Sequence, residues 1–159
     1  MCSLSKTLTL LNDILVKRER SPDIIPISET KLNGNYLSNV SIPGYLFVNT
    51  NSKTSAGGVS LYLAGELNFI RRHDLELPAY GVESCWIEIT SKKEQNVIIG
   101  CLYRHPHIHP HCKLESFHDV MKERLQGLNS SSEQVIVSDD TNINNIALIL
   151  NHRLPRHAS

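Results

Sequence analysis

Two apolar segments of this sequence run directly into side chains that carry oxygen atoms able to bind metal. Residues 135–142 read VIVSDDTN, and residues 23–28 (DIIPIS) are followed at once by Glu29. Because residues two apart on an extended chain share a face, Asp140 and Asn142 are predicted to point the same way. Carboxylate and amide oxygens suit a hard cation such as magnesium, which polarises phosphate and activates water. An ordinary buried strand followed by an Asx-rich turn is the alternative interpretation.

Another predicted strand ends in Tyr103 and Arg104. A phenol can donate a hydrogen bond to a phosphate oxygen, and a guanidinium can hold a phosphate with two hydrogen bonds. The two side chains are therefore candidate phosphate contacts. A strand-end aromatic ring beside a surface arginine is the alternative.

The segment HPHIHPHC at residues 105–112 is a compositional exception. Its candidate metal ligands are His105, His107, His109, His111 and Cys112. Alternating histidines with a cysteine can bind zinc or nickel. Structural zinc usually takes its ligands from two separated pairs, however, and the prolines keep this segment extended. A small metal-binding protein and an exposed loop without metal both remain open as interpretations.

Length and composition indicate one packed domain. The chain has 159 residues, of which 40% are hydrophobic and 20% charged, so we expect a core and no general disorder. A formal net charge of +0 excludes a bulk attraction for nucleic acid but allows a local basic patch. No apolar run approaches the length that spans a bilayer, and the first residues do not resemble a signal peptide. Four cysteines without C-x-x-C spacing favour free thiols in a reducing, intracellular compartment.

Hydrophobic periodicity predicts two helices and a series of strands that would position these side chains. The helices are expected at 5–20 and 114–128. The strands are expected at 23–28, 45–49, 59–65, 67–72, 83–90, 96–104 and from 135, with 67–72 as a hairpin partner of 59–65 and with 83–90 and 96–104 as a second hairpin. Val59, Leu61 and Leu63 should share one face. Successive strands favour antiparallel sheets whose faces the helices cover, which is an α+β fold.

Six segments, taken in order, resemble one known family. They are PDIIPISETKL (22–32), IPGYLF (42–47), GGVSLYL (57–63), ESCWIEI (83–89), VIIGCLYRHP (97–106) and VIVSDDTNIN (135–144). The set resembles the endonuclease/exonuclease/phosphatase family, and within it the endonuclease domain of jockey- and CR1-like non-LTR retrotransposons. The resemblance implies a two-sheet β-sandwich flanked by helices that hydrolyses phosphodiesters with magnesium. In those elements the domain nicks target DNA to prime reverse transcription.

The resemblance also implies roles for individual residues. Glu29 looks like the family's metal-binding glutamate, and Tyr103 looks like the tyrosine that contacts the scissile phosphate. Asp140 and Asn142 look like the aspartate and asparagine that orient the attacking water and bind phosphate. The partner would be DNA, with the nucleus as the family's place of action.

The chain also departs from the family pattern. Asp139 stands where the family has glycine, and Thr141 stands where it usually has phenylalanine. No early strand with an asparagine precedes the first helix, and nothing after Asn145 matches the family's closing aspartate and Asp-His pair. A placed general base typically contributes about a hundredfold to ten-thousandfold in rate. Weak or absent activity is therefore expected.

These departures predict a truncated family domain over residues 1–145 and a divergent, frayed tail over 146–159. The expected fold class is α+β, a partial two-sheet β-sandwich flanked by helices with its C-terminal part missing. Loss of closing strands would uncover apolar sheet surface and promote self-association. Three functional hypotheses follow: an impaired magnesium-dependent endonuclease, a non-catalytic remnant that binds DNA or protein, and a His-rich metal-binding protein.

Overall fold

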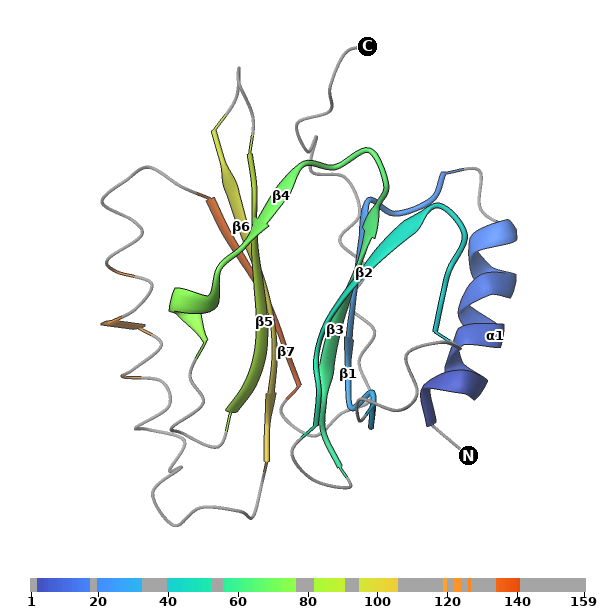
Figure 1. Cartoon of the computed structure of the whole chain (residues 1–159), viewed down its shortest axis with the longest axis horizontal. Coiled ribbons are helices and arrows are strands. Elements are labelled where there is room, and N and C mark those ends of the chain that lie inside the picture. Colours follow the sequence, from blue (N-terminus) through green and yellow to red (C-terminus); the bar gives the residue numbers. More distant parts are fainter. Residues whose placement is uncertain are drawn as a thin grey trace.

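The chain is an α+β protein whose strands form two sheets (Figure 1). The computed structural model describes residues 3–17, 20–32, 40–52, 56–76, 82–90, 95–105, 119, 122–123, 126 and 134–140, with the backbone alone at 3–7 and 139–140. The elements are α1 (Ser3–Val16), β1 (Ile24–Ser28), β2 (Tyr45–Thr50), β3 (Val59–Ala64), β4 (Phe69–Arg71), the 3-10 helix η2 (His73–Leu75), β5 (Val82–Ile89), β6 (Val97–Arg104) and β7 (Gln134–Asp140).

The two sheets pack face to face around one apolar core. One sheet has the order β1-β3-β2 and the other the order β4-β5-β6-β7. The predicted inward face of β3 is confirmed, because Val59, Leu61 and Leu63 all lie in the core between the sheets. Cys85 and Ile87 of β5 meet them from the opposite sheet. Alternation along each strand thus places one set of side chains inside the sandwich.

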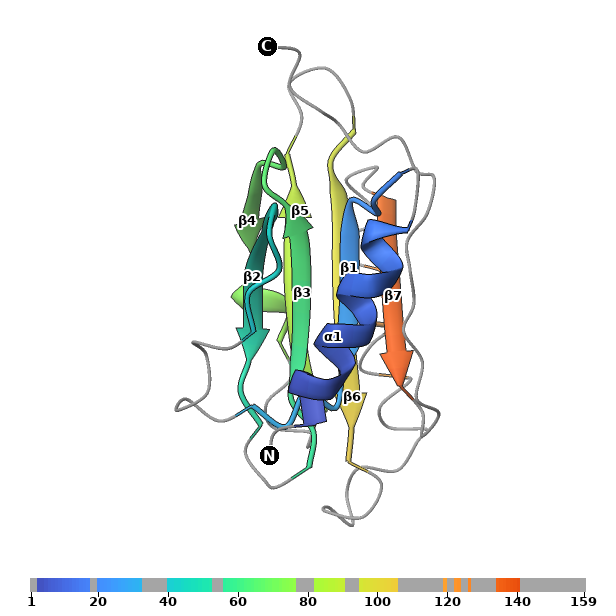
Figure 2. The same ribbon diagram turned by 90° about the vertical axis from the view of Figure 1, so that its right-hand side faces the viewer.

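Helix α1 covers the outer face of the first sheet (Figure 2). Leu8 and Leu11, three residues apart on one side of the helix, are buried against Ile25, Ile27 and Tyr62. The helix is shorter at its C-terminal end than the sequence predicted, since it ends at Val16 instead of residue 20. Residues 17–20 (KRER) have no apolar side chain to place against the sheet.

The predicted hairpin between 59–65 and 67–72 is wrong. Strand β4 pairs antiparallel with β5 of the second sheet, with Phe69 opposite Ile89. The physical reason is that β1 and β2 already occupy the two edges of β3. After the turn at Gly65 and Glu66, the chain therefore crosses from one sheet to the other.

The predicted hairpin of 83–90 and 96–104 is confirmed as β5 and β6, with Ile89 opposite Val97. Strand β7 then pairs with β6 in parallel, although the sequence favoured antiparallel sheets. A parallel pair needs a crossover connection, and the predicted helix at 114–128 falls within it. Only positions 119, 122, 123 and 126 of that helix are described, and all four are helical and exposed. The expected tail at 146–159 lies outside the described residues.

Within the described part of the chain, no helix has the length and apolar character needed to cross a membrane.

Candidate functional site

The strands that lead to the predicted site residues end at the same end of the sandwich. Strands β1, β6 and β7 all run toward the lower end in Figure 1. At that end Tyr103 of β6 is the register partner of Glu83 on β5 and of Asp140 on β7. The hydroxyl of Thr50, the last residue of β2, donates to the Ser84 carbonyl across the sheets at 2.8 Å. The ends of the two sheets are therefore in direct contact.

Glu29 lies immediately beyond β1 and is half-buried. Its backbone is in the left-handed region at φ 52, and Lys31 follows at φ 55. Such a conformation costs a residue other than glycine about 1–3 kcal/mol and persists only where its surroundings hold it. Here the Thr30 amide donates to the Gly58 carbonyl at 3.1 Å and the Lys31 amide to the Gly57 carbonyl at 2.7 Å. Pairing with the residues before β3 thus fixes the backbone around Glu29.

Tyr103 is buried on the inner side of the sandwich, with 3% of its surface exposed. Its ring stands edge-on to the His105 imidazole, with centroids 4.8 Å apart and planes at 89°. Because adjacent residues of a strand face opposite ways, half-buried Arg104 points away from the face that Tyr103 occupies. The structure therefore does not bring the two predicted phosphate contacts together on one face.

Asp140 is the last residue of β7, so the strand continues through the acidic pair. Its backbone is described, and its register position is opposite Tyr103. Asn142 lies outside the described residues, as do His107, His109, His111 and Cys112.

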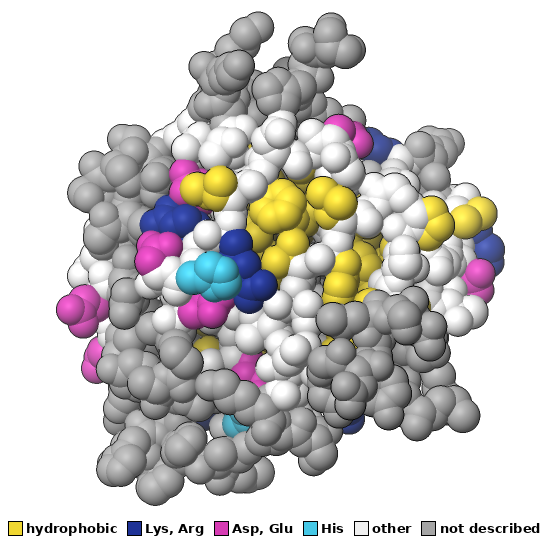
Figure 3. Space-filling model, in the orientation of Figure 1, with side chains coloured by type: hydrophobic (Ala, Val, Ile, Leu, Met, Phe, Trp, Pro, Cys, Tyr) yellow, Lys and Arg dark blue, Asp and Glu magenta, His cyan; other side chains and the backbone are white. Residues whose placement is uncertain are grey.

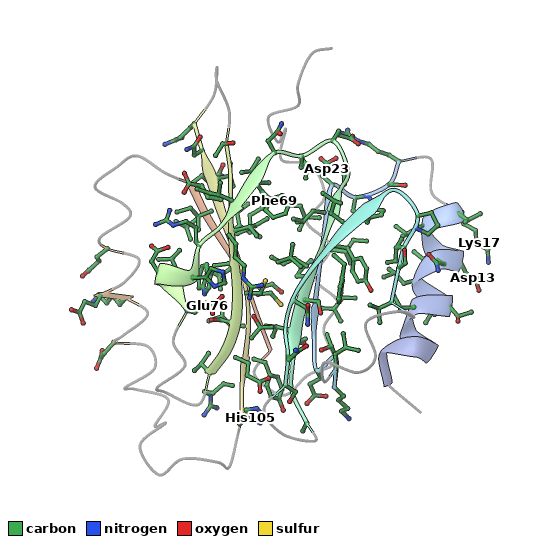
Figure 4. The ribbon with its side chains drawn as sticks, viewed as in Figure 1. Asp13, Lys17, Asp23, Phe69, Glu76 and His105 are labelled. Atoms are coloured by element: carbon green, nitrogen blue, oxygen red, sulfur yellow. The ribbon has the colours of Figure 1, made fainter. Side chains whose placement is uncertain are left out.

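A buried pair, Glu83 and His105, was missed as a site by the sequence interpretation, which considered His105 only as a zinc or nickel ligand. Glu83 is 4% exposed and His105 is 7% exposed, with Nε2 of His105 3.1 Å from Oε1 of Glu83. An ionised carboxylate only accepts hydrogen bonds, so the imidazole nitrogen is the donor. The sequence did contain a signal for placing Glu83 at the site, since a hairpin centred on residue 93 puts Glu83 opposite Tyr103. His105 lies at the lower end of the molecule in Figure 4.

Gly57 and Gly58 link this pair to the Glu29 segment. Both have positive φ, 96 and 84, as suits the bend that the sequence predicted there. The Gly58 amide donates to Oε2 of Glu83. A Cβ on Gly57 would collide with Oε2 of Glu83 and come within 2.9 Å of His105 Nε2, and one on Gly58 would collide with Thr30 Oγ1.

The Glu29 carboxylate at this end is of the chemical kind that magnesium takes as a ligand. Among the described residues no three His, Cys, Asp or Glu side chains gather as a metal site. His105 and Glu83 bond to each other, which leaves the Glu29 carboxylate as the described acidic group next to the strand ends. Magnesium commonly takes one or two carboxylates and keeps several waters, so Glu29 is the described residue that could hold it. The contact with Glu83 occupies Nε2 of His105, so zinc or nickel binding at His105 would have to use Nδ1.

The sequence matches no family model, and no curated protein is significantly similar to it.

Proposed function

We propose that this chain is an endonuclease-like domain of the endonuclease/exonuclease/phosphatase type, which hydrolyses phosphodiester bonds of DNA with magnesium. The observation that carries the proposal is the shared end of three strands. The end of β1 that leads to Glu29 lies with the ends of β6 and β7, where Tyr103 and Asp140 are register partners. Elements far apart in the sequence thus place oxygen-bearing residues at one edge of the sandwich.

Each residue has one task in this proposal. Glu29 would hold the ion, which when bound supplies charge stabilisation at the phosphate and a more acidic water. Tyr103 would contact a phosphate oxygen through its hydroxyl. Asp140 and Asn142 would orient the attacking water.

We expect slow cleavage. Asp139 and Thr141 stand where the family has glycine and phenylalanine, which adds a charge and removes an apolar anchor beside the proposed site. Binding of DNA without cleavage is the second candidate. A domain that acts on chromosomal DNA would work in the nucleus.

A plasmid-nicking assay with magnesium tests the function. Glu29→Ala is expected to lower the nicking rate at least about a hundredfold, since metal-based stabilisation is worth several kcal/mol and each 1.4 kcal/mol is about tenfold. Glu66→Ala is the matched control, because Glu66 is an exposed glutamate in the turn after β3, at the opposite end of that strand. Equal nicking by wild type and Glu29→Ala would contradict the proposal. DNA retention without nicking in wild type would support the second candidate.

A further inference from the structure

Glu83 connects the second sheet to the backbone of the first. Its Oε2 accepts from the Gly58 amide. Its Oε1 lies 3.1 Å from His105 Nε2 and 3.4 Å from the Ser52 hydroxyl. Both carboxylate oxygens therefore have hydrogen-bond partners, and all three partners lie outside β5. A buried carboxylate is stable only when it is bonded in this way.

The glycines carry this connection on to Glu29. The Gly58 amide donates to Glu83. The Gly58 carbonyl accepts from the Thr30 amide, and the Gly57 carbonyl accepts from the Lys31 amide. Those two amides directly follow Glu29, whose backbone is in the left-handed region. Hydrogen bonds on both sides of the Gly57–Gly58 backbone thus connect Glu83 to the two peptide groups beyond Glu29.

We propose that Glu83 is a positioning residue for Glu29, acting through Gly57 and Gly58. The proposal deepens the proposed function, since it rests on Glu29 as the metal ligand. His105 supports Glu83 by donating to it, and its ring closes the space beside Gly57. An ion pair that served stability alone would need no link to the Glu29 segment. The structure has such a pair on the same strand for comparison, Glu88 with Arg72 at 2.6 Å.

Amide hydrogen exchange without metal tests the path itself. Glu83→Ala is expected to raise exchange at Thr30 and Lys31 at least about tenfold relative to Glu88→Ala, because only the first change releases the Gly58 amide. Glu88→Ala is the matched control, since it also removes a buried carboxylate of β5 that is 7% exposed. Glu83→Gln keeps an oxygen for Gly58, so its exchange at both amides should stay within about threefold of wild type. Equal exchange in Glu83→Ala and Glu88→Ala would overturn the proposal.

A second variant covers the case in which Glu83→Ala does not fold. His105→Asn leaves the carboxylate in place and removes its imidazole donor. It should raise exchange at Thr30 and Lys31 in the same direction, by about threefold or more. No change at those amides would overturn the path.

Titration with manganese, as a spectroscopic substitute for magnesium, tests the consequence for the metal. Glu83→Ala should weaken manganese binding about 10- to 100-fold, the scale seen when a group that orients a ligand is lost, while Glu88→Ala should not. If wild type binds manganese through Glu29 and Glu83→Ala binds it equally well, the inference fails and the function stands. If wild type binds no manganese while the exchange pattern appears, the function fails and the positioning path stands.

Discussion

Tyr103 and Asp140 are register partners in the parallel strands β6 and β7. The tyrosine and the acidic strand end therefore lie next to each other, although they are distant in the sequence.

Tyr103→Phe should lower plasmid nicking about tenfold or more while the protein stays folded. The ring and its edge contact with His105 remain, and only the hydroxyl is lost, which costs stability about 1 kcal/mol. Tyr62→Phe is the control, since the Tyr62 hydroxyl donates to the Val40 carbonyl at 2.6 Å in the core under α1. Nicking by Tyr103→Phe at the rate of Tyr62→Phe would exclude a phosphate contact.

Gly57→Ala should destabilise the protein by about 2–5 kcal/mol, measured by urea unfolding. A left-handed backbone costs a side chain about 1–2 kcal/mol, and forcing Cβ against Glu83 adds about 1–3 kcal/mol. Gly44→Ala separates the two effects, because Gly44 also has a positive φ, 82, but a Cβ added there would meet no atom within 4 Å. Equal losses in the two variants would show that the contact with Glu83 is unimportant.

Magnesium should raise the melting temperature of wild type but not of Glu29→Ala. A ligand at ten times its dissociation constant stabilises the folded state by about 1.4 kcal/mol, which is about 3–6 °C for a protein of this size. Differential scanning fluorimetry with and without EDTA measures the shift. A shift that survives in Glu29→Ala would place the ion elsewhere.

Alkaline pH should weaken the fold in part through Cys85. Burial raises the pKa of this thiol from 9.0 to about 11. The folded pKa is above the unfolded one, so the stabilisation is complete below pH 9 and is lost as the pH rises toward 11. The loss approaches about 3 kcal/mol. Burial also raises the pKa of Tyr62, so the contribution of Cys85 has to be separated by mutation. The free energy of unfolding of Cys85→Ala is compared with that of wild type at about pH 8 and about pH 10.5, on either side of the unfolded thiol pKa. An identical pH dependence in the two proteins would contradict the assignment to Cys85.

Self-association should involve the open edge between β2 and β4. These are the end strands of their sheets in the described part of the chain. Leu46 of β2 and Ile70 of β4 are 47% and 51% exposed. Hydrophobic side chains gather in the middle of that face, beside basic, histidine and acidic side chains (Figure 3). Ile70→Lys should shift the protein toward monomer in size-exclusion chromatography, and an unchanged elution profile would exclude this edge.

The sequence predicted local elements better than their partners. Period-two alternation was sufficient to identify β3 and the β5–β6 hairpin, because each depends on neighbouring residues. The partner of β4 was mispredicted, since a single strand pattern does not show that both edges of β3 are occupied. The parallel pairing of β7 depends on a connection whose path the sequence pattern does not give.

In the candidate site, too, local features could be predicted from the sequence, whereas contacts between distant segments could not. Strand ends at Glu29, Tyr103 and Asp140 could be identified from apolar runs that stop at polar residues. Glu83 was missed because it begins a strand and its role depends on two glycines from the other sheet. Arg104 was paired with Tyr103 by sequence adjacency, whereas strand alternation separates them.

The parallel pairing of β6 and β7 sets an order for assembly. Hairpin β5–β6 closes across a short turn, but β7 can join only after a long crossover has been closed, which is entropically slower. The contacts among Glu83, Gly58 and Thr30 do not need β7. The hairpin β5–β6 can therefore form while the β6 edge that receives β7 is still uncovered.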